Sequence, residues 1–479
     1  LEQLDIIDNM KSDEPSTAKR ISLLELLDNT KTPLGKILLR QRLSIPITDS
    51  QILQDRYKEI ADLEDLHNAY MILGETSSST SLASLSSVSN ISKTSKISDK
   101  YGSPLHQLRM KLTGIRNIDN YLRKIITQKI QPNDIENYVD SLVKCINVYE
   151  LVVKIFKNQS NHPSNHPSNL PTDKSYSNFV ALYNTINKDI NMESLKMANI
   201  WSALENNPFV KGVSAKLDDL QSEIDNDREF LDNLILELSK ILEPNFKNDT
   251  SKQIILIGEN ATKGIHIYTN KTRKDLLEQY FAKPNTSLKI GNYKITSKEI
   301  KYTQIKESKW EIDIIYLKTS NGTLRANIDK MGRIVKNEFM LWLSEKIVNN
   351  SDILDSLNDM SHFISEIDVL QSNVLNVVDK GYTRPLIDNT AEHSFFRADM
   401  LRHPIIEHIT TKEKYIPNDI ALGSDSSVCG VLLFGVNAVG KSSLMKSIGI
   451  NIIMAQAGMY VASSNFCYKP YKYLFTRIR

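Results

Sequence analysis

The chain has 479 residues, of which 41% are apolar, and a formal net charge of +2 at pH 7. Its length allows about three domains with separate cores. No run of eighteen apolar residues occurs, so no membrane-spanning helix and no membrane partner are predicted. The three cysteines are widely spaced and odd in number, which argues against a disulfide framework and favours an intracellular, reducing compartment.

Long helices are predicted on both sides of a central segment. Residues 1–75 are helical in pattern, with a capped helix over 51–66. Apolar residues at alternating spacings of four and three then form a heptad seam over 213–241, which predicts a long helix ended by Pro244. A second stripe predicts a returning helix over 324–348. The pair favours an antiparallel arm, although an ordinary helical bundle would show the same spacing.

Two polar stretches interrupt the helical pattern. Residues of about 76–100 are rich in serine, and those of about 158–175 contain a tandem Ser-Asn-His-Pro repeat. Such compositions predict disordered surface insertions. His162 and His166 each precede proline in this flexible stretch, which disfavours a metal site there.

The segment between the two long helices, 252–309, is basic and glycine-punctuated. It holds twelve Lys and Arg against five Asp and Glu, an excess of seven, which leaves the rest of the chain at −5. Short apolar runs predict strands at 254–257, 265–268 and 290–295. A small basic tip on an arm predicts contact with a phosphate backbone, and lysine in place of arginine favours charge neutralisation over base reading. A solvated basic face is the alternative. The candidate DNA contacts are Lys263, Lys271, Arg273, Lys274, Lys294 and Lys298.

A nucleotide-binding loop is predicted near the C-terminal end. It fits G-x-x-x-x-G-K-[ST] and consists of Gly435, Val436, Asn437, Ala438, Val439, Gly440, Lys441, Ser442 and Ser443. The apolar run 431–434 before it predicts a buried parallel strand, and a helix follows it. The glycines would let backbone N–H groups approach the phosphates of ATP or GTP. Lys441 would reach the β- and γ-phosphates, and the Ser442 hydroxyl would complete a Mg²⁺ shell. A glycine-containing turn without a ligand is the alternative.

Hydrolysis needs a further acidic residue that holds magnesium and positions water. Residues 443–479 contain no Asp or Glu, and the acidic run 310–315 precedes the loop in a differently patterned region. We therefore expect the chain to be a piece of a longer ATPase that binds nucleotide weakly without turning it over. Whether the chain is an enzyme stays open, and no catalytic residue is assigned.

These motifs together resemble the MutS family of DNA mismatch repair ATPases. The resemblance rests on LLDNT, TPLG, LLR and PITD within 26–49, IRNID at 115–119, QPNDI at 131–135, EIDVL at 366–370, YTRP at 382–385, RHPIIE at 402–407, YIPND at 415–419, the loop 435–443, AQAGMYV at 455–461 and FTRI at 475–478. Val436 and Val439 replace the family's proline and middle glycine, a variant that resembles the giant-virus and octocoral-mitochondrial branch. The candidate locations are therefore the cytoplasm, the nucleus and a viral factory.

The resemblance implies a mixed, mainly helical fold. It places a helical core and outgoing lever at 1–251, a small β-rich clamp at 252–316, the returning lever and core at 317–396, and the first part of an α/β P-loop ATPase domain at 397–479. It further implies ATP and Mg²⁺ as cofactors, and as partners double-stranded DNA and a second MutS-type subunit in a homo- or heterodimer. Tyr415 would stack on adenine, unless it is a core tyrosine, and Asn437 would contact the terminal phosphates. His403 is interpreted as structural.

The leading hypothesis is an ATP-dependent mismatch repair clamp whose nucleotide state moves the levers. The family's mismatch-reading wedge, Phe-x-Glu, does not occur in these 479 residues. A related recombination or junction-binding clamp without mismatch reading is therefore the alternative. A chromosome-organising ATPase also combines coiled coils with a P-loop, but it normally carries the loop before the coils.

Overall fold

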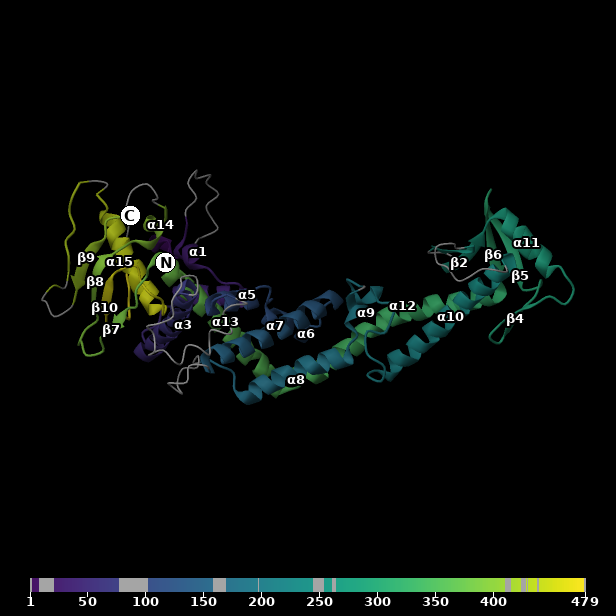
Figure 1. The fold of residues 1–479 in the computed structure, drawn as a ribbon, viewed down its shortest axis with the longest axis horizontal. Coiled ribbons are helices and arrows are strands. Elements are labelled where there is room, and N and C mark those ends of the chain that lie inside the picture. The colour runs from purple at the N-terminus through teal and green to yellow at the C-terminus, as the bar shows by residue number, and fades with distance from the viewer. Residues whose placement is uncertain are drawn as a thin grey trace. The chain divides into compact units, whose positions relative to one another are not determined.

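Figure 1 shows the computed structural model of the chain, which is mainly helical with small, chiefly antiparallel sheets. The chain divides into two compact units. The core unit comprises Leu1–Arg123, Asn137–Tyr183 and Ser351–Arg479, and the arm unit comprises Lys124–Glu136 and Asn184–Asn350. The structure describes residues 2–7, 21–76, 102–157, 169–196, 198–243, 254–260, 264–409, 415–423, 428, 430–436 and 439–477. Within these residues, no helix is both long and apolar enough to cross a membrane.

The core unit is built around one long buried helix, α13 (Ser351–Lys380). The helices packed against it are α2 (Pro33–Ser44), α3 (Ser50–Thr76) and α5 (Pro104–Leu112), with the short α1 (Leu23–Leu27) beside them. The helix predicted over 51–66 is confirmed as part of α3. Further helices are α6 (Ile118–Ile126), α7 (Pro132–Lys157) and α8 (Asp173–Asp189).

The predicted polar inserts lie mostly outside the described residues, at 77–101 and 158–168. The second insert was predicted to reach 175, which is wrong at its end, because α8 already begins at Asp173. An acidic residue in the first helical turn favours that start, since it complements the positive end of the helix dipole.

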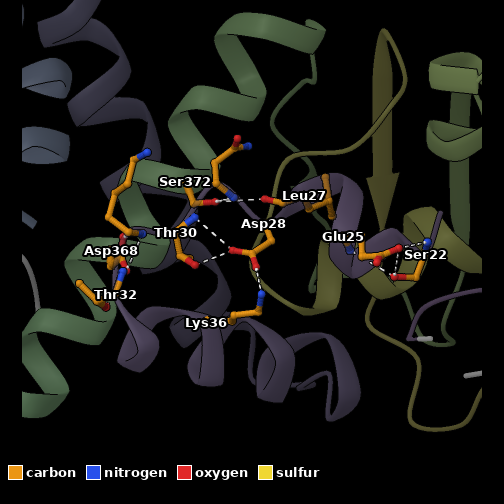
Figure 2. A network of polar contacts seen from close by, with 11 residues as sticks. Ser22, Glu25, Leu27, Asp28, Thr30, Thr32, Lys36, Asp368 and Ser372 are labelled. Carbon is orange, nitrogen blue, oxygen red and sulfur yellow. Dashed lines mark hydrogen bonds and ion pairs between the residues drawn. The ribbon is translucent and has the colours of Figure 1, made fainter. Parts of the chain in front are cut away.

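Buried polar groups join α13 to the chain around residues 27–32. Asp368 accepts hydrogen bonds from the backbone N–H groups of Lys31 (2.8 Å) and Thr32 (2.7 Å) and from the Thr32 hydroxyl (2.7 Å). One turn later, the Ser372 hydroxyl donates to the Leu27 carbonyl (3.1 Å). Figure 2 shows Asp368 and Ser372 reaching from α13 to this segment, which leads into α2. The join therefore fixes where α2 begins relative to α13.

A mixed sheet and one further helix complete the core unit. The sheet has the order β7-β10-β8-β9, in which only β7 and β10 run parallel. Its strands are β7 (Leu386–Ile387), β8 (Phe396–Leu401), β9 (Asn418–Leu422) and β10 (Asn465–Tyr468). The neighbouring helical segments are η1 (Glu2–Leu4), α14 (Pro404–Ile409) and α15 (Lys441–Gln456).

The arm unit contains the two long helices that the sequence predicts. They are α10 (Ala215–Leu242) and α12 (Ile315–Leu343), which pack on each other. The heptad prediction is confirmed at six positions that are buried: Leu217, Leu220, Ile224, Leu231, Leu234 and Leu238. The predicted returning helix differs in two ways, because α12 begins nine residues earlier and its continuation Ser344–Val348 is a π-helix. The short segments α9 (Met192–Lys196) and η3 (Trp201–Ala203) lie in the same unit.

Between α10 and α12 the chain forms a small β-rich tip. Its four-stranded sheet has the order β1-β2-β6-β5, and a separate hairpin pairs β3 with β4. The strands are β1 (Leu256–Asn260), β2 (Gly264–Thr269), β3 (Leu288–Ile290), β4 (Tyr293–Ile295), β5 (Ile300–Lys306) and β6 (Lys309–Ile314), with the helix α11 (Lys271–Phe281) after β2. The strand predicted over 265–268 is confirmed as part of β2, and the one predicted at 254–257 overlaps β1, which begins two residues later and ends three residues later. A strand throughout 290–295 is a wrong prediction, because this segment holds the end of β3, a turn and β4. The helix α11 is not predicted. The end of α10, the helix α11, the sheet and the hairpin contribute to one buried apolar cluster, formed mainly by isoleucines and leucines.

Candidate nucleotide-binding loop and basic tip

The predicted nucleotide-binding loop leads into α15, whose first three residues are the last three of the motif. Gly440 is the N-cap of this helix and adopts φ of +92°, a left-handed conformation that favours glycine. A Cβ atom on Gly440 would meet no atom within 4 Å, so the loop is open on that side. Ser442 is exposed in the first turn. Asn437 and Ala438 lie outside the described residues.

Lys441 places its charge on the loop itself. Its Nζ donates hydrogen bonds to the carbonyl oxygens of Gly435 (2.7 Å) and Val436 (2.6 Å). The ammonium group and the N-terminal N–H groups of α15 therefore gather at the same end of the helix. Both attract anions, because four N–H groups at a helix start have no partner within the helix and the helix dipole is positive there.

The expected buried strand before the loop is a wrong prediction. Residues 431–434 form no strand, and Leu432 and Phe434 are 89% and 88% exposed. An apolar run becomes a buried strand only where a neighbouring strand supplies hydrogen bonds and another layer covers it. The sheet β7-β10-β8-β9 does not include this segment among its paired strands.

Tyr415 lies near the same helix as the loop. Burial raises the pKa of its hydroxyl, and a hydrogen bond with Ser447 on α15 acts in the opposite direction. Ser447 is six residues after Lys441, a rise of about 9 Å along a helix. The structure thus brings Tyr415 to the first half of α15, which is compatible with either interpretation of this side chain.

His403, interpreted from sequence as structural, is buried at the start of α14, with 2% of its surface exposed. Its Nδ1 accepts a hydrogen bond from the Ile406 N–H (3.4 Å), and its Nε2 has no partner within the described residues. Burial, with the positive charge of Lys446 as a second cause, lowers the pKa of His403 to about 4. The imidazole is therefore neutral at pH 7 and caps the backbone of α14.

The loop offers few groups for a metal ion. No cluster of three His, Cys, Asp or Glu side chains suited to a metal occurs in the described part of the chain. The exposed Ser442 hydroxyl fits a single ligand position of Mg²⁺. This ion is normally held by one or two protein oxygens together with water and substrate phosphates.

The basic tip presents a subset of the predicted lysines to solvent. Lys271, Lys294 and Lys298 are exposed, whereas Lys263 lies outside the described residues. The Arg273 guanidinium donates a hydrogen bond to the Ile254 carbonyl (3.0 Å) within the tip. Five other exposed lysines belong to the twelve basic residues counted in this segment but were not among the candidate DNA contacts: Lys283, Lys289, Lys301, Lys306 and Lys309.

Lys274 has structural partners inside the tip. Its ammonium group bonds Glu278 (2.5 Å), lies 3.4 Å from Asp275, and stands 4.9 Å from the ring centre of Trp310. Only 13% of its side chain is exposed. The hydrogen bond to Glu278 is the main cause that raises the pKa of Lys274. Its charge is therefore balanced within α11 and shielded by an aromatic ring.

Two exposed lysines face each other across the β3–β4 hairpin. Lys289 and Lys294 are direct register partners, and both are exposed. Like charges directly opposite each other in an antiparallel pair destabilise it. The pair makes a local positive surface that an anionic partner would neutralise.

Comparison with known proteins supplies the family. A sequence profile of MutS domain III matches residues 1–373 of this chain. A putative DNA mismatch repair protein, a mutS homolog of Acanthamoeba polyphaga mimivirus, is 24% identical over 100% of this chain and 42% of the relative. The DNA mismatch repair protein MutS of Petrotoga mobilis is 22% identical over 98% of this chain and 47% of the relative. A mitochondrial DNA mismatch repair protein, a mutS homolog of Sarcophyton glaucum, is 41% identical over 24% of this chain and 12% of the relative.

The fold combines a helical core, an arm of paired helices and a glycine loop at the start of a helix. The profile match shows that the chain belongs to the MutS family. The family prediction is confirmed, including its similarity to a mimivirus homologue and an octocoral mitochondrial homologue. The chain spans less than half the length of these relatives.

Proposed function

We propose that this chain carries the core, the arm and the nucleotide-binding loop of an ATP-dependent DNA mismatch repair protein. In this proposal the nucleotide state controls how the basic tip holds duplex DNA. The core and outgoing lever occupy 1–251, the clamp 252–316, the returning lever 317–396, and the start of an α/β ATPase domain 397–479. The observation that carries the nucleotide part is the position of Lys441 at the start of α15, with its ammonium group on the loop carbonyls.

The chemistry at the loop follows from the groups present. Lys441 exchanges its two carbonyl contacts for the β- and γ-phosphates of ATP, and Ser442 contributes its hydroxyl to Mg²⁺. Asn437 contacts the terminal phosphates, and the Tyr415 ring stacks on adenine. Bound Mg²⁺ neutralises phosphate charge. No hydrolytic residue is assigned in this chain.

The DNA part of the proposal rests on the exposed lysines of the tip. Lys271, Lys294 and Lys298, with Lys289 opposite Lys294, lie within the same small β-rich region. Lysine neutralises phosphates without a geometric preference for base edges, so the contact is independent of sequence. The partners proposed are double-stranded DNA and a second MutS-type subunit, in a homo- or heterodimer.

Nucleotide binding is tested by titrating the chain with a fluorescent ATP analogue and Mg²⁺. Lys441→Ala is expected to weaken binding at least about tenfold, because it removes a charge-assisted contact worth about 1.5–3 kcal/mol. Lys446→Ala is the matched control, since Lys446 lies on the same helix and pairs with Asp5. Equal affinity of Lys441→Ala and the unmodified chain would contradict the proposal.

DNA binding is tested by salt titration with a homoduplex, a mismatched duplex and a four-way junction. If about four lysines neutralise phosphates, log K falls with log salt at a slope of about −3.6. Tighter binding to the mismatched duplex supports mismatch repair, whereas tighter binding to the junction supports the recombination-type clamp. Binding with no salt dependence would contradict the phosphate-contact proposal.

A further inference from the structure

The helix α15 has two different halves. Its first turns, which carry Lys441, Ser442 and Met445, are exposed or half-buried. Its second half, Gly449–Gln456, is buried throughout. A ligand at the loop therefore acts on one end of a helix whose other end is embedded in the core unit. Sixteen residues of helix span about 24 Å.

The buried end of α15 is tied to the start of α3. The Tyr57 hydroxyl donates a hydrogen bond to the Ala455 carbonyl (2.6 Å), and the Arg56 guanidinium donates one to the Ala457 carbonyl (3.2 Å). The Ala455 carbonyl also accepts from the Gly458 N–H (2.8 Å), so the Tyr57 hydroxyl is its second donor. The end of α15 thus has a defined position on α3.

Gln456 makes the most extensive of these ties. Its Nε2 donates to the carbonyls of Ile47 (3.0 Å) and Tyr471 (2.9 Å), and its Oε1 accepts from the Tyr471 N–H (3.0 Å). Its own carbonyl accepts from the Ile47 N–H (2.9 Å). The side chain is 4% exposed, so these bonds form away from water. One amide therefore joins α15, the chain after β10 and the connection between α2 and α3.

The connection between α2 and α3 is linked to α13 through α2. Ile47 lies three residues after the last residue of α2, and α2 is held to α13 near both of its ends. At the start, Thr32 donates two hydrogen bonds to Asp368. Near the other end, Arg42 forms a buried ion pair with Glu366. A shift of Ile47 would be passed to α2, and through these bonds to the central helix of the core unit.

We propose that Gln456 is a positioning residue that couples a nucleotide at the start of α15 to α2 and α13. The inference rests on the proposed nucleotide binding, and it adds the route by which that binding reaches the core. A small displacement of α15 moves the Gln456 amide, and the hydrogen bond from its Nε2 to the Ile47 carbonyl carries the movement, because a packed interior has few intermediate arrangements.

The test is hydrogen exchange of residues 44–57 in the chain, with and without saturating ATP and Mg²⁺. Nucleotide is expected to change exchange rates in this segment by about fivefold or more, which lies at the lower end of known coupling. Gln456→Met keeps the length of the side chain and removes its three hydrogen bonds. It is expected to bind nucleotide with affinity within about threefold of the unmodified chain and to lose the exchange response.

The matched control is Gln371→Met. Gln371 is also buried in the core unit, and its amide also makes three hydrogen bonds, to Asn29, Asp368 and Arg109, none of which lies on α15. This variant should keep the exchange response, because loss of a buried amide alone does not disconnect the loop. If both variants lose the response equally, the effect is general destabilisation and the proposal is wrong.

Two further outcomes are distinguishable. Nucleotide binding to the unmodified chain without any exchange response at 44–57 overturns the coupling and leaves the proposed function intact. No nucleotide binding at all overturns the proposed function first. If Gln456→Met does not fold, Gln456→Asn replaces it, since its shorter amide cannot reach both carbonyls. An unchanged exchange response in Gln456→Asn would then contradict the proposal.

Discussion

The core unit and the tip of the arm unit both bury apolar side chains, but buried polar side chains also join distant parts of the core unit. In the core unit, buried polar side chains such as Asp368 and Gln456 bond backbone groups that are more than 300 residues away in the chain. At the tip, α10, α11 and the strands share one cluster of mainly leucines and isoleucines, among them Leu234 and Ile312. Apolar contacts tolerate changes of shape, whereas a buried hydrogen bond requires one donor opposite one acceptor. The polar contacts that join the core unit thus depend on individual atoms, whereas the apolar cluster of the tip depends mainly on volume.

The largest predicted difference between the units appears on acidification. The pKa of His403 is lowered to about 4, below the usual 6.5, so between these values the unfolded chain binds a proton that the folded core does not. The contribution of His403 to the stability of the core unit is complete above pH 6.5, falls as the pH drops and stops changing below about 4. The loss amounts to about 3 kcal/mol. Urea unfolding of the chain between pH 7 and pH 4 measures it.

The control for this prediction lies on the same helix. His408 is exposed on α14. His403→Gln should remove the acid-dependent loss, whereas His408→Gln should leave it unchanged. An identical pH dependence in the His403 variant and the unmodified chain would show that the imidazole does not titrate as its burial demands.

The next prediction compares the stability cost of changing one atom of a side chain in the core unit with the cost of replacing a whole side chain at the tip. Asp368→Asn keeps the shape but turns an NH₂ group toward donors, so we expect a loss of about 2–3 kcal/mol in core stability. Leu234→Met also replaces a fully buried side chain. We expect it to cost less than about 1.5 kcal/mol, because the volume is kept. Chemical unfolding, followed by probes in each unit, compares the two variants.

If Asp368→Asn and Leu234→Met lowered the free energy of unfolding equally, the proposed difference between polar contacts in the core unit and apolar contacts at the tip would be wrong. A second control is Ser372→Ala, which removes two hydrogen bonds, one donated to the Leu27 carbonyl (Figure 2) and one accepted from the Asn29 N–H. It should cost about 1–2 kcal/mol, less than the loss of the larger set of bonds at Asp368. A loss as large as that of Asp368→Asn would show that the number of bonds does not set the cost.

The same contrast explains what the sequence could predict. Apolar spacing predicted α10 and the buried face of its heptads, because packing by volume leaves a periodic record. The glycine loop was predicted because φ at Gly440 and the charge of Lys441 need particular residues. The segment 431–434 failed, because an apolar run does not record whether a neighbouring strand exists.

Residues that act through distant partners were also missed. Gln456 stands between two alanines, which marks it as buried but names no partner. Gln371 is followed by Ser372 and Asn373, and its sequence context indicates neither its burial nor its partners. Only the fold brings Ile47 to Gln456 and Asn29 to Gln371. At the tip, the charge count located a basic segment, but it could not separate the shielded Lys274 from the exposed Lys294.

The smallest predicted effect on stability separates function from folding at the tip. Lys294→Glu places a negative charge directly opposite Lys289 in the β3–β4 hairpin. The change replaces a repulsive cross-strand pair by an attractive one, so we expect the arm unit to gain about 0.5 kcal/mol. DNA affinity should fall at the same time. Loss of one neutralised phosphate makes the slope of log K against log salt less negative by about 0.9.

The opposite signs give this prediction its value. A variant that is more stable and binds DNA more weakly cannot owe its defect to unfolding. Lys283→Glu is the matched control, because Lys283 is exposed in the same tip outside the hairpin strands. It should leave stability unchanged while testing whether any lost positive charge weakens binding equally. If the two variants weaken binding alike, general charge governs the contact. If Lys294→Glu binds DNA more weakly than Lys283→Glu, the facing lysines Lys289 and Lys294 form a defined phosphate contact. DNA binding at the tip would then depend on the position of individual side chains, as the polar contacts of the core unit do.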